Sequence, residues 1–466
     1  MRKYVIPVIC LFMAVAMGKV ALAEESTMVF GRFGTIIIYR EKPQPANVIL
    51  FVSGDGGWNQ GVVDMARELA GMDALVAGID IVHYLKQLSG SSEPCSYPAA
   101  DFENLSHYLQ KRLEFPQYVL PVLIGYSSGA TLVYATLAQS PPGTFLGAMS
   151  LGFCPDLPLT RPFCKGSGLA MEPGPKGKGI NFLPSGNLKD PWIALQGEVD
   201  QVCDPEGMRR FVSQVANGEI VMLPKVGHGY SVPRNWMPQF REAFLKLSQQ
   251  QVQSGKPVDA DLSDLPLVEV PAAGSPRNAL AVVITGDGGW AGVDQEIAAG
   301  LAAAGVGVVG LNALKYFWTA RTPESLGADL DRILRHYLNR WKKDQALLIG
   351  YSMGADVMPF AVNHLSKILR DQVKCVALLA PGKQTAFEFH LSNWMGGGEG
   401  ATYPVQPEVD RIEGPEIICL YGRTEADSLC PLLDAGRVKV MEMKGGHHFG
   451  GDFEPLIQAI ISQIER

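Results

Sequence analysis

The sequence lacks several features that would mark other classes of protein. It has no Cys-x-x-Cys pair and no spacing of cysteine and histidine that would hold a metal ion, so we expect neither a metal nor a cofactor. Positive charge is scarce, because 40 Lys and Arg stand against 47 Asp and Glu in 466 residues. The net charge of −7 argues against nucleic acid as a partner and against strong unaided attraction to anionic lipid. After the first 23 residues no apolar run is long enough to cross a bilayer.

Those first 23 residues have the pattern of a secretory signal peptide. Arg2 and Lys3 precede an apolar stretch at 4–17, and Ala21-Leu22-Ala23 is a small-x-small cleavage site. The alternative is a membrane anchor, but the stretch is shorter than the roughly 20 residues that a membrane span needs. We therefore expect cleavage after Ala23 and export of the protein.

Seven cysteines follow this leader, and export makes disulfide bonds between them possible. The odd number requires at least one free thiol or an intermolecular bond, and the sequence leaves the pairing open. Four lie in the first half of the chain and three in the second: Cys95, Cys154, Cys164 and Cys203, then Cys375, Cys419 and Cys430.

The chain reads as two copies of one domain. Three motifs return in the same order: SGDGGW at 53–58 as TGDGGW at 285–290, GYSSG at 125–129 as GYSMG at 350–354, and VGHGY at 226–230 as GGHHF at 445–449. A polar segment without periodicity separates the copies and predicts a linker. We expect domains at 24–250 and 267–466, joined by a linker at 251–266.

Within each half, short apolar strands alternate with amphipathic helices. In the second half, ALAVVI and ALLIG are typical of strands that are covered on both faces. The stretch 322–341 predicts a helix, with Thr322 as its cap and Pro323 at the first helical position. This alternation predicts the α/β class, with a doubly wound, mostly parallel sheet in each domain.

Each half also carries a Gly-x-Ser-x-Gly motif between an apolar strand and a helix, which is the nucleophile elbow of α/β-hydrolases. A serine nucleophile needs a histidine base and an orienting acid, in the chain order serine, acid, histidine. The second half supplies Ser352 and then His447, with His448 as the alternative base. Asp427, with the shorter side chain, is our preferred acid, and Glu425 is the alternative.

The first half supplies the same order in Ser127, Asp200 and His228. These residues form a possible second triad, and the sequence leaves open whether one site is active or both. The alternative is a tight strand–helix turn with an incidental serine in either half.

The glycine-dense loops have a function in this scheme. Hydrolases of this type need backbone N–H donors for the tetrahedral oxyanion, one of them from the residue after the nucleophile, here Met353 or Ser128. The second donor is expected from a loop that follows an earlier strand. The loop lacks the last glycine of a dinucleotide-binding motif and the Gly-Lys-Ser/Thr of a phosphate loop. The expected oxyanion and substrate loop in the second half is Gly286, Asp287, Gly288 and Gly289, and its counterpart is Asp55 and Gly56.

The aspartate in this loop would repel the oxyanion. It must therefore turn away, face a cationic group on the substrate, or hold the loop through its own backbone.

Taken together, TGDGGW, GYSMGADVMPF, GRTEADSLCP and GGHHF resemble the bacterial virulence VirJ/AcvB family, closely over about 270–466 and more loosely over 24–250. The resemblance implies an α/β-hydrolase fold, a periplasmic location and an association with virulence and type IV secretion. It also implies activity on aminoacylated phospholipid, specifically lysyl-phosphatidylglycerol. The matched triad is Ser352, Asp427 and His447.

We therefore expect a periplasmic serine esterase, a carboxylic ester hydrolase that removes the aminoacyl group from lipid at the membrane surface. Components or secreted substrates of a type IV secretion system are further expected partners. The alternative is a non-catalytic accessory or scaffold protein of that system, with the hydrolase fold kept as architecture. Two ordered triads argue against this alternative.

Overall fold

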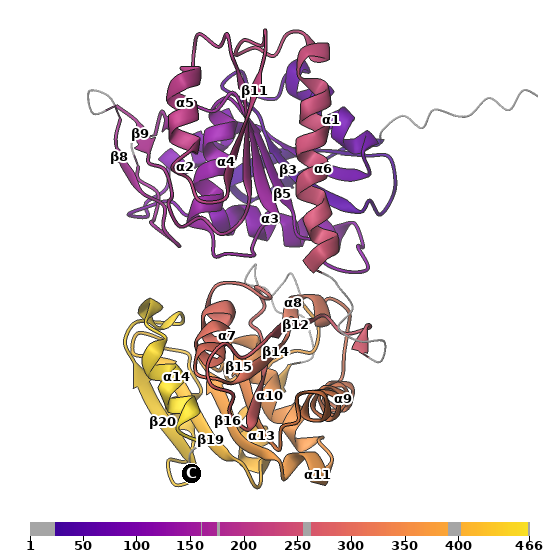
Figure 1. Cartoon of the computed structure of the whole chain (residues 1–466), viewed down its shortest axis with the longest axis vertical. Coiled ribbons are helices and arrows are strands. Elements are labelled where there is room, and N and C mark those ends of the chain that lie inside the picture. The colour runs from indigo at the N-terminus through magenta and orange to yellow at the C-terminus, as the bar shows by residue number, and fades with distance from the viewer. Residues whose placement is uncertain (1–23, 160, 175–177, 255–261, 390–401, 465–466) are drawn as a thin grey trace, which may run out of the picture.

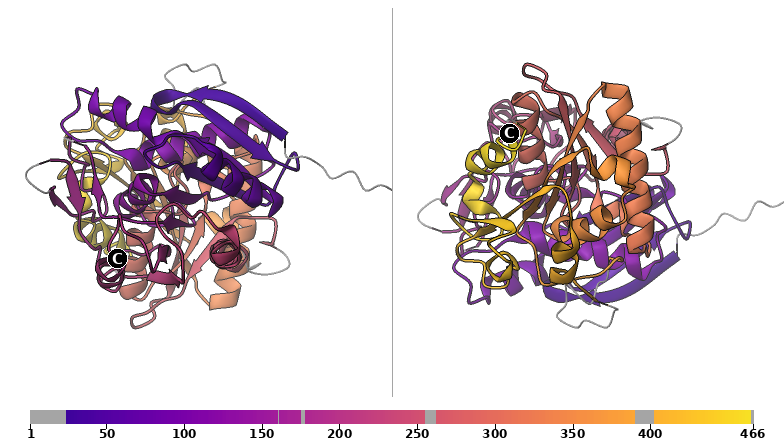
Figure 2. Two further views of the ribbon diagram at one scale, coloured as in Figure 1. Left: turned by 90° about the horizontal axis from the view of Figure 1, so that it is seen from above. Right: turned by 90° about the horizontal axis from the view of Figure 1, so that it is seen from below.

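The computed structural model describes residues 24–159, 161–174, 178–254, 262–389 and 402–464, so the expected leader lies outside the described residues. Each half of the chain forms one large sheet, and the halves stack with the first one uppermost in Figure 1. Figure 2 views this stack from its two ends. The predicted class, two tandem α/β domains with mostly parallel sheets, is confirmed.

The first sheet has eight strands in the order β1-β2-β4-β3-β5-β6-β10-β11. β2 is antiparallel to both of its neighbours, and the remaining pairs are parallel. The strands are β1 (Glu24–Phe30), β2 (Gly34–Arg40), β3 (Asn47–Val52), β4 (Ala74–Ile79), β5 (Val122–Tyr126), β6 (Gly147–Leu151), β10 (Trp192–Gly197) and β11 (Gly218–Leu223). The helices are α1 (Gln60–Gly71), α2 (Ile81–Ser89), α3 (Pro98–Arg112), α4 (Ser128–Gln139), α5 (Pro205–Val212) and α6 (Met237–Ser254).

The second sheet repeats this order over seven strands, β12-β14-β13-β15-β16-β19-β20, with only β12 antiparallel. The strands are β12 (Leu267–Val270), β13 (Ala279–Ile284), β14 (Gly307–Leu311), β15 (Gln345–Tyr351), β16 (Val373–Leu379), β19 (Glu416–Gly422) and β20 (Val438–Met443). The helices are α7 (Val293–Ala303), α8 (Ala313–Tyr316), α9 (Pro323–Trp341), α10 (Met353–Asn363), α11 (Lys367–Arg370), α13 (Gln406–Arg411) and α14 (Glu454–Ile461). Two small sheets lie outside the main ones: β7 (Asp156–Leu157), β9 (Ile180–Phe182) and β8 (Met171–Pro173), and β17 (Gln384–Thr385) with β18 (Tyr403–Pro404).

The strands are apolar throughout because helices cover both faces of each sheet. All six residues of β13 are buried, as the run ALAVVI predicts. Helices α2 to α5 pack on one face of the first sheet, and α1 and α6 pack on the other. The second sheet has α9 and α10 on one face and α7 and α14 on the opposite face.

Helix α9 shows how closely local sequence specifies these elements. Thr322 and Ser325 form a reciprocal capping box, and Pro323 occupies the first turn, as predicted. Lys342 ends the helix in the left-handed conformation. Its buried stripe, which packs on the sheet, is Leu326, Leu330, Ile333, Leu334, Tyr337 and Leu338.

The topology places a crevice at the carboxyl edge of each sheet. The helix that follows β3 covers one face, whereas the helix that follows the neighbouring β5 covers the other. The loops after these two strands therefore diverge, and such a switch point is where open α/β sheets bind ligands. The strands β13 and β15 repeat this arrangement.

Aromatic side chains join the two domains. The indole Nε1 of Trp318 donates to the carbonyl of Phe115 at 2.7 Å, and Lys111 Nζ donates to the carbonyl of Trp318 at 2.6 Å. An apolar cluster surrounds these contacts, formed by Tyr118, Leu314, Trp318 and Phe389. Part of the expected linker also belongs to the domains, because α6 continues to Ser254 and Leu262 is buried in the second core.

Three disulfide bonds lie within the domains and none between them among the described residues: Cys95–Cys164, Cys154–Cys203 and Cys419–Cys430. Cys375 is free and buried, so the odd cysteine is a free thiol. Disulfides of this number are consistent with an extracytoplasmic location. No helix in the described part of the chain has the length and apolarity to cross a membrane.

Candidate active sites

The two serines stand on sharp turns between a strand and a helix. Ser127 has φ of +56° and Ser352 has φ of +52°, in the left-handed region that L residues rarely occupy. Helix α4 begins at Ser128 and α10 at Met353, directly after each serine. Both turns are therefore nucleophile elbows, as the sequence predicts.

The flanking glycines are required by close backbone contacts. A Cβ at Gly125 would lie 2.1 Å from the carbonyl oxygen of Gly129, and one at Gly350 would lie 2.3 Å from that of Gly354. A Cβ at Gly354 would lie 2.0 Å from the carbonyl oxygen of Ile284, on the strand before the glycine loop. These close backbone contacts place the elbow next to the glycine loop.

The first triad is assembled completely. Oγ of Ser127 lies 2.9 Å from Nε2 of His228, and Nδ1 of His228 lies 2.9 Å from Oδ2 of Asp200. Oδ1 of Asp200 accepts from the backbone N–H of Cys203 at 3.1 Å, so both carboxylate oxygens are held. The structure brings together all three residues that the sequence proposes for this half.

The second triad is assembled with a different acid from the one preferred on sequence. Oγ of Ser352 lies 2.9 Å from Nε2 of His447, and Nδ1 of His447 lies 2.5 Å from Oε1 of Glu425. Asp427 is exposed to solvent, and no hydrogen bond joins it to His447. His448 lies beside His447 and has its pKa lowered by burial and by that neighbour. The structure therefore replaces Asp427 by Glu425, the alternative acid, and keeps His447.

Loop register explains this correction. Glu425 and Asp200 each stand three residues after the last glycine of a strand. The backbone N–H of each donates to the carbonyl of that glycine and so forms the same turn. The second loop has two more residues than the first before its cysteine, and they come after the acid. Asp427 lies in this added part and points outward.

The glycine loops lie against the elbows. A Cβ at Gly286 would lie 3.4 Å from Cβ of Ser352, and one at Gly54 would lie 3.0 Å from Cβ of Ser127. The Gly289 N–H is used in a turn to the Gly286 carbonyl, at 3.0 Å. The first N–H of a helix has no partner within that helix, so the N–H of Met353 is available for an oxyanion.

The tryptophan of each glycine loop anchors the loop to the sheet. Trp290 packs on Gly310 of β14 and Trp58 packs on Gly78 of β4, where a Cβ would lie only 1.9 and 2.2 Å from the indole. Trp58 also donates through Nε1 to the hydroxyl of Tyr39 at 3.1 Å. Thus the tryptophan that ends each glycine-dense hexapeptide fixes the position of the loop that precedes it.

The two sites differ in their loop aspartates. Asp55 accepts a hydrogen bond from Oγ of Ser128 at 2.7 Å. In the second domain Met353 occupies the position of Ser128 and offers no side-chain donor. Asp287 instead lies near Glu103 of the first domain, close enough to raise the pKa of that carboxyl group.

Sequence reasoning missed two positioning residues. The tyrosine before each nucleophile donates to the carbonyl of the histidine base: Tyr126 to His228 at 2.9 Å and Tyr351 to His447 at 3.3 Å. The Gly-Tyr-Ser sequence common to both elbows is the signal that could have identified them.

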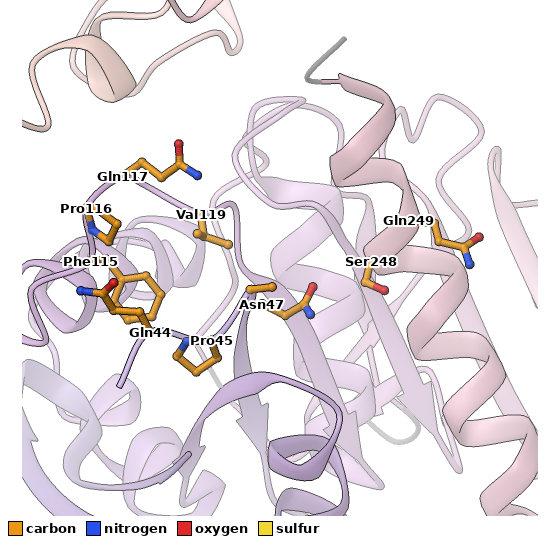
Figure 3. Close-up of a pocket in the computed structure, with 10 residues that line it drawn as sticks. Gln44, Pro45, Asn47, Phe115, Pro116, Gln117, Val119, Ser248 and Gln249 are labelled. Atoms are coloured by element: carbon orange, nitrogen blue, oxygen red, sulfur yellow. The ribbon is translucent and has the colours of Figure 1, made fainter. Parts of the chain in front are cut away.

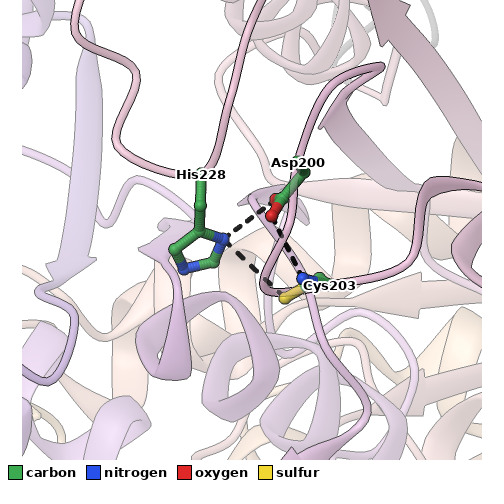
Figure 4. Close-up of side chains that lie close together, drawn as sticks. All are labelled: Asp200, Cys203 and His228. Carbon is green, nitrogen blue, oxygen red and sulfur yellow. Dashed lines mark hydrogen bonds and ion pairs between the residues drawn. The ribbon is translucent and has the colours of Figure 1, made fainter.

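One cluster in the first domain has the residue types of a metal site. Asp200, Cys203 and His228 lie close together, and Figure 4 shows the Asp200 carboxylate and the Cys203 sulfur on the same side of the imidazole. The Cys203 sulfur is bonded to Cys154, so it is not available as a thiolate ligand. His228 and Asp200 are already paired in the triad, and the cluster is explained by that triad.

The second site opens into a hollow of about 820 Å³ between the domains. Ser352 and His447 line it from the second domain, and Tyr97, Glu103 and Pro142 line it from the first. The amino-terminal edge of the first sheet therefore covers the carboxyl edge of the second. A smaller hollow of about 490 Å³ in the first domain (Figure 3) is lined by residues such as Gln44, Asn47 and Phe115, and none of its lining residues is charged.

Carboxyl groups gather around the second site. Burial, with the nearby Asp287 charge, raises the pKa of Glu103 to about 8. Burial likewise raises the pKa of Asp356 to about 8, with Asp287 and Glu425 adding to the shift. Asp294 has its pKa raised by burial and by Asp287, while a hydrogen bond from the Gly286 N–H lowers it.

Comparison with known proteins agrees with the sequence pattern. The model of the family described as bacterial virulence protein (VirJ) matches residues 46–145 and 278–466. Comparison with curated protein sequences finds no match.

Similar solved structures each cover about half of this chain. They include the esterase domain of a Rhodothermus marinus protein (14% identity, 49% of this chain and 98% of that chain, TM-score 0.33). A Thermogutta terrifontis esterase 2 phosphonylated by cyclosarin has 17% identity, with 49% and 94% coverage and a TM-score of 0.33. A lidless α/β serine hydrolase from Xanthomonas campestris has 16% identity, with 51% and 96% coverage and a TM-score of 0.31.

Proposed function

This chain belongs to the VirJ family of bacterial virulence proteins, and we propose that it is a periplasmic serine esterase acting on the aminoacyl ester of an aminoacylated phospholipid, with lysyl-phosphatidylglycerol as the expected substrate. The observation that carries the proposal is the Ser352–His447–Glu425 array on a nucleophile elbow. This array lies in the half of the chain that resembles the family most closely.

The geometry supports a two-step acyl transfer. Ser352 Oγ attacks the ester carbonyl while Nε2 of His447 takes the hydroxyl proton, and Glu425 stabilises the imidazolium. Backbone N–H groups of Met353 and of Asp287 or Gly288 in the glycine loop hold the oxyanion. His447 then gives the proton to the departing lipid hydroxyl, which leaves an aminoacyl ester on Ser352.

Water completes the cycle. His447 takes a proton from a water molecule, and the resulting hydroxide attacks the acyl carbonyl. The Ser352 oxygen leaves and recovers the proton from His447. The products are the free amino acid and the lipid with its hydroxyl restored, and no cofactor is consumed.

The charges at the site support an aminoacyl group over a fatty acyl group. An aminoacyl ester carries an ammonium group close to the carbonyl under attack, and a lysyl ester carries two. Four carboxyl groups line the hollow that contains Ser352 among its described residues: Glu103, Asp287, Asp294 and Glu296. A purely apolar acyl chain would gain little from these neighbours.

The test is active-site labelling followed by lipid hydrolysis. The purified protein is treated with a fluorophosphonate, and the modified serine is mapped by mass spectrometry. We expect an adduct on Ser352, and release of lysine from vesicles that contain lysyl-phosphatidylglycerol. A protein that is folded but labelled at neither Ser352 nor Ser127 would favour the accessory or scaffold function.

A further inference from the structure

Resting on the proposed esterase function, we propose that Glu103 of the first domain, together with Asp287 and Asp294 of the second, forms a binding site for an ammonium group of the acyl part of the substrate. The first domain would then be part of the second domain's active site and would determine its specificity. These three carboxyl groups line the hollow between the domains, which also contains Ser352.

Glu103 reaches the glycine loop from the opposite domain. Its Oε1 lies 3.7 Å from the position that a Cβ on Gly288 would take. Among the described residues no hydrogen bond or ion pair is made by the Glu103 side chain, and it is half-buried. Thus a carboxyl group from α3 is held beside the second oxyanion loop without a partner of its own.

The interface fixes α3 in this position. Lys111, two turns further along the same helix, donates to the Trp318 carbonyl at 2.6 Å and lies 3.6 Å from the Glu388 carboxylate. On the other side of the hollow, the Gly292 N–H donates to the Pro142 carbonyl at 3.4 Å. Because these contacts hold the two domains together, the position of Glu103 is set by how the domains pack.

Asp294 is an independent indication of a cation site. Its residue is only 3% exposed, and it lines the same hollow. The Gly286 N–H donates a hydrogen bond to this carboxyl group, but Oδ1 has no hydrogen-bond partner in the described structure. A buried carboxylate oxygen without a donor is costly, and an ammonium group would supply the donor.

Few basic side chains line the hollow. Lys189 is the one basic residue among the described lining residues apart from two histidines, and its side chain is exposed. Burial and repulsion from Asp287 raise the pKa of the Glu103 carboxyl group. Binding of an ammonium group beside Glu103 would favour the ionised form of its carboxyl group.

The first site offers a contrast within the same chain. There Asp55 already accepts from Ser128, a donor that Met353 replaces in the second site. In the second site the elbow residue offers no side-chain donor to the loop aspartate, and the first domain brings another carboxyl group close to it. This difference assigns cation recognition to the second site.

The test compares two substrates that differ in their ammonium groups, the ethyl esters of lysine and of hexanoic acid. Their acyl chains have the same length, and acid release is followed by titration. We expect Glu103→Gln to lower kcat/KM for the lysine ester about 10- to 100-fold, the range of one charge-assisted hydrogen bond, and to change the hexanoate value less than about twofold. Glu242→Gln is the matched control, because it removes one exposed carboxylate from α6 of the same domain. It should change neither rate.

The outcomes separate this inference from the proposed function. If the wild-type protein hydrolyses neither ester nor the lipid, the esterase proposal fails. If the wild type is active and Glu103→Gln lowers both esters equally, or neither, the ammonium site is wrong while the esterase stands. Restoration of most of the preference for lysine by Glu103→Asp would support a role for the carboxylate itself, and thermal melting of each variant confirms that it is folded.

Discussion

Glu425 Oε1 lies 2.5 Å from Nδ1 of His447, and this contact identifies the acid of the second triad. Asp427, two residues further on, is exposed in the added part of the loop. We expect Glu425→Gln to lower kcat by about 10⁴-fold, because loss of the orienting carboxylate leaves the imidazole in the wrong tautomer. Asp427→Asn should change kcat less than about twofold. Steady-state kinetics on the lysine ester checks both, and the opposite ranking would return the role to Asp427.

The two triads should differ in function although both are assembled. Fluorophosphonate should label Ser127 as well as Ser352, since each hydroxyl lies 2.9 Å from its histidine. Ser352→Ala should abolish hydrolysis of lysyl-phosphatidylglycerol, whereas Ser127→Ala should retain most of it. Release of lysine from lipid vesicles is the measurement. Equal losses in the two variants would show that both sites act on the lipid.

The loop aspartate should recognise the α-ammonium group, because Asp287 belongs to the loop that lies against Ser352. Asp287→Asn is expected to lower kcat/KM for the norleucine ethyl ester, which has only the α-ammonium group, about 10-fold or more. The hexanoic ester, which has none, should be affected less than about twofold. Equal loss on both esters would assign Asp287 to loop structure alone. Glu242→Gln, which removes an exposed carboxylate from α6, is the matched control and should leave both rates unchanged.

Stability should depend on pH through Asp356. Burial raises the pKa of this carboxyl group to about 8 in the folded protein, well above its value in the unfolded chain. Between about pH 4 and pH 8 the folded state therefore binds more protons than the unfolded state, and this group makes stability fall as pH rises. Asp356→Asn keeps an oxygen that can accept from the Gly382 N–H.

The substitution should accordingly raise the melting temperature more at pH 8.5 than at pH 5, relative to wild type. Differential scanning calorimetry at the two pH values measures this difference. The exposed Asp371, which pairs with Lys367 on the surface, offers a control, and Asp371→Asn should show no such pH dependence. A larger gain for Asp356→Asn at pH 5 would contradict the assigned shift.

Much of this protein follows from local sequence. The repeated motifs, the apolar strands and the capped helix at 323–341 indicate two α/β domains, because each element is specified by residues only a few positions apart. The same holds for Ser127 and Ser352, whose elbows need glycines at fixed spacing, and for His228 and His447 in glycine loops.

Tertiary structure decided the rest. The choice of Glu425 over Asp427 depends on loop register at a strand end, where two added residues move one carboxylate away from the histidine. The meeting of Glu103 with Asp287 depends on how two complete domains stack, and these residues are far apart in the chain. Periodicity and spacing describe one element at a time, so they carry no information about contacts that form only when separate elements pack together.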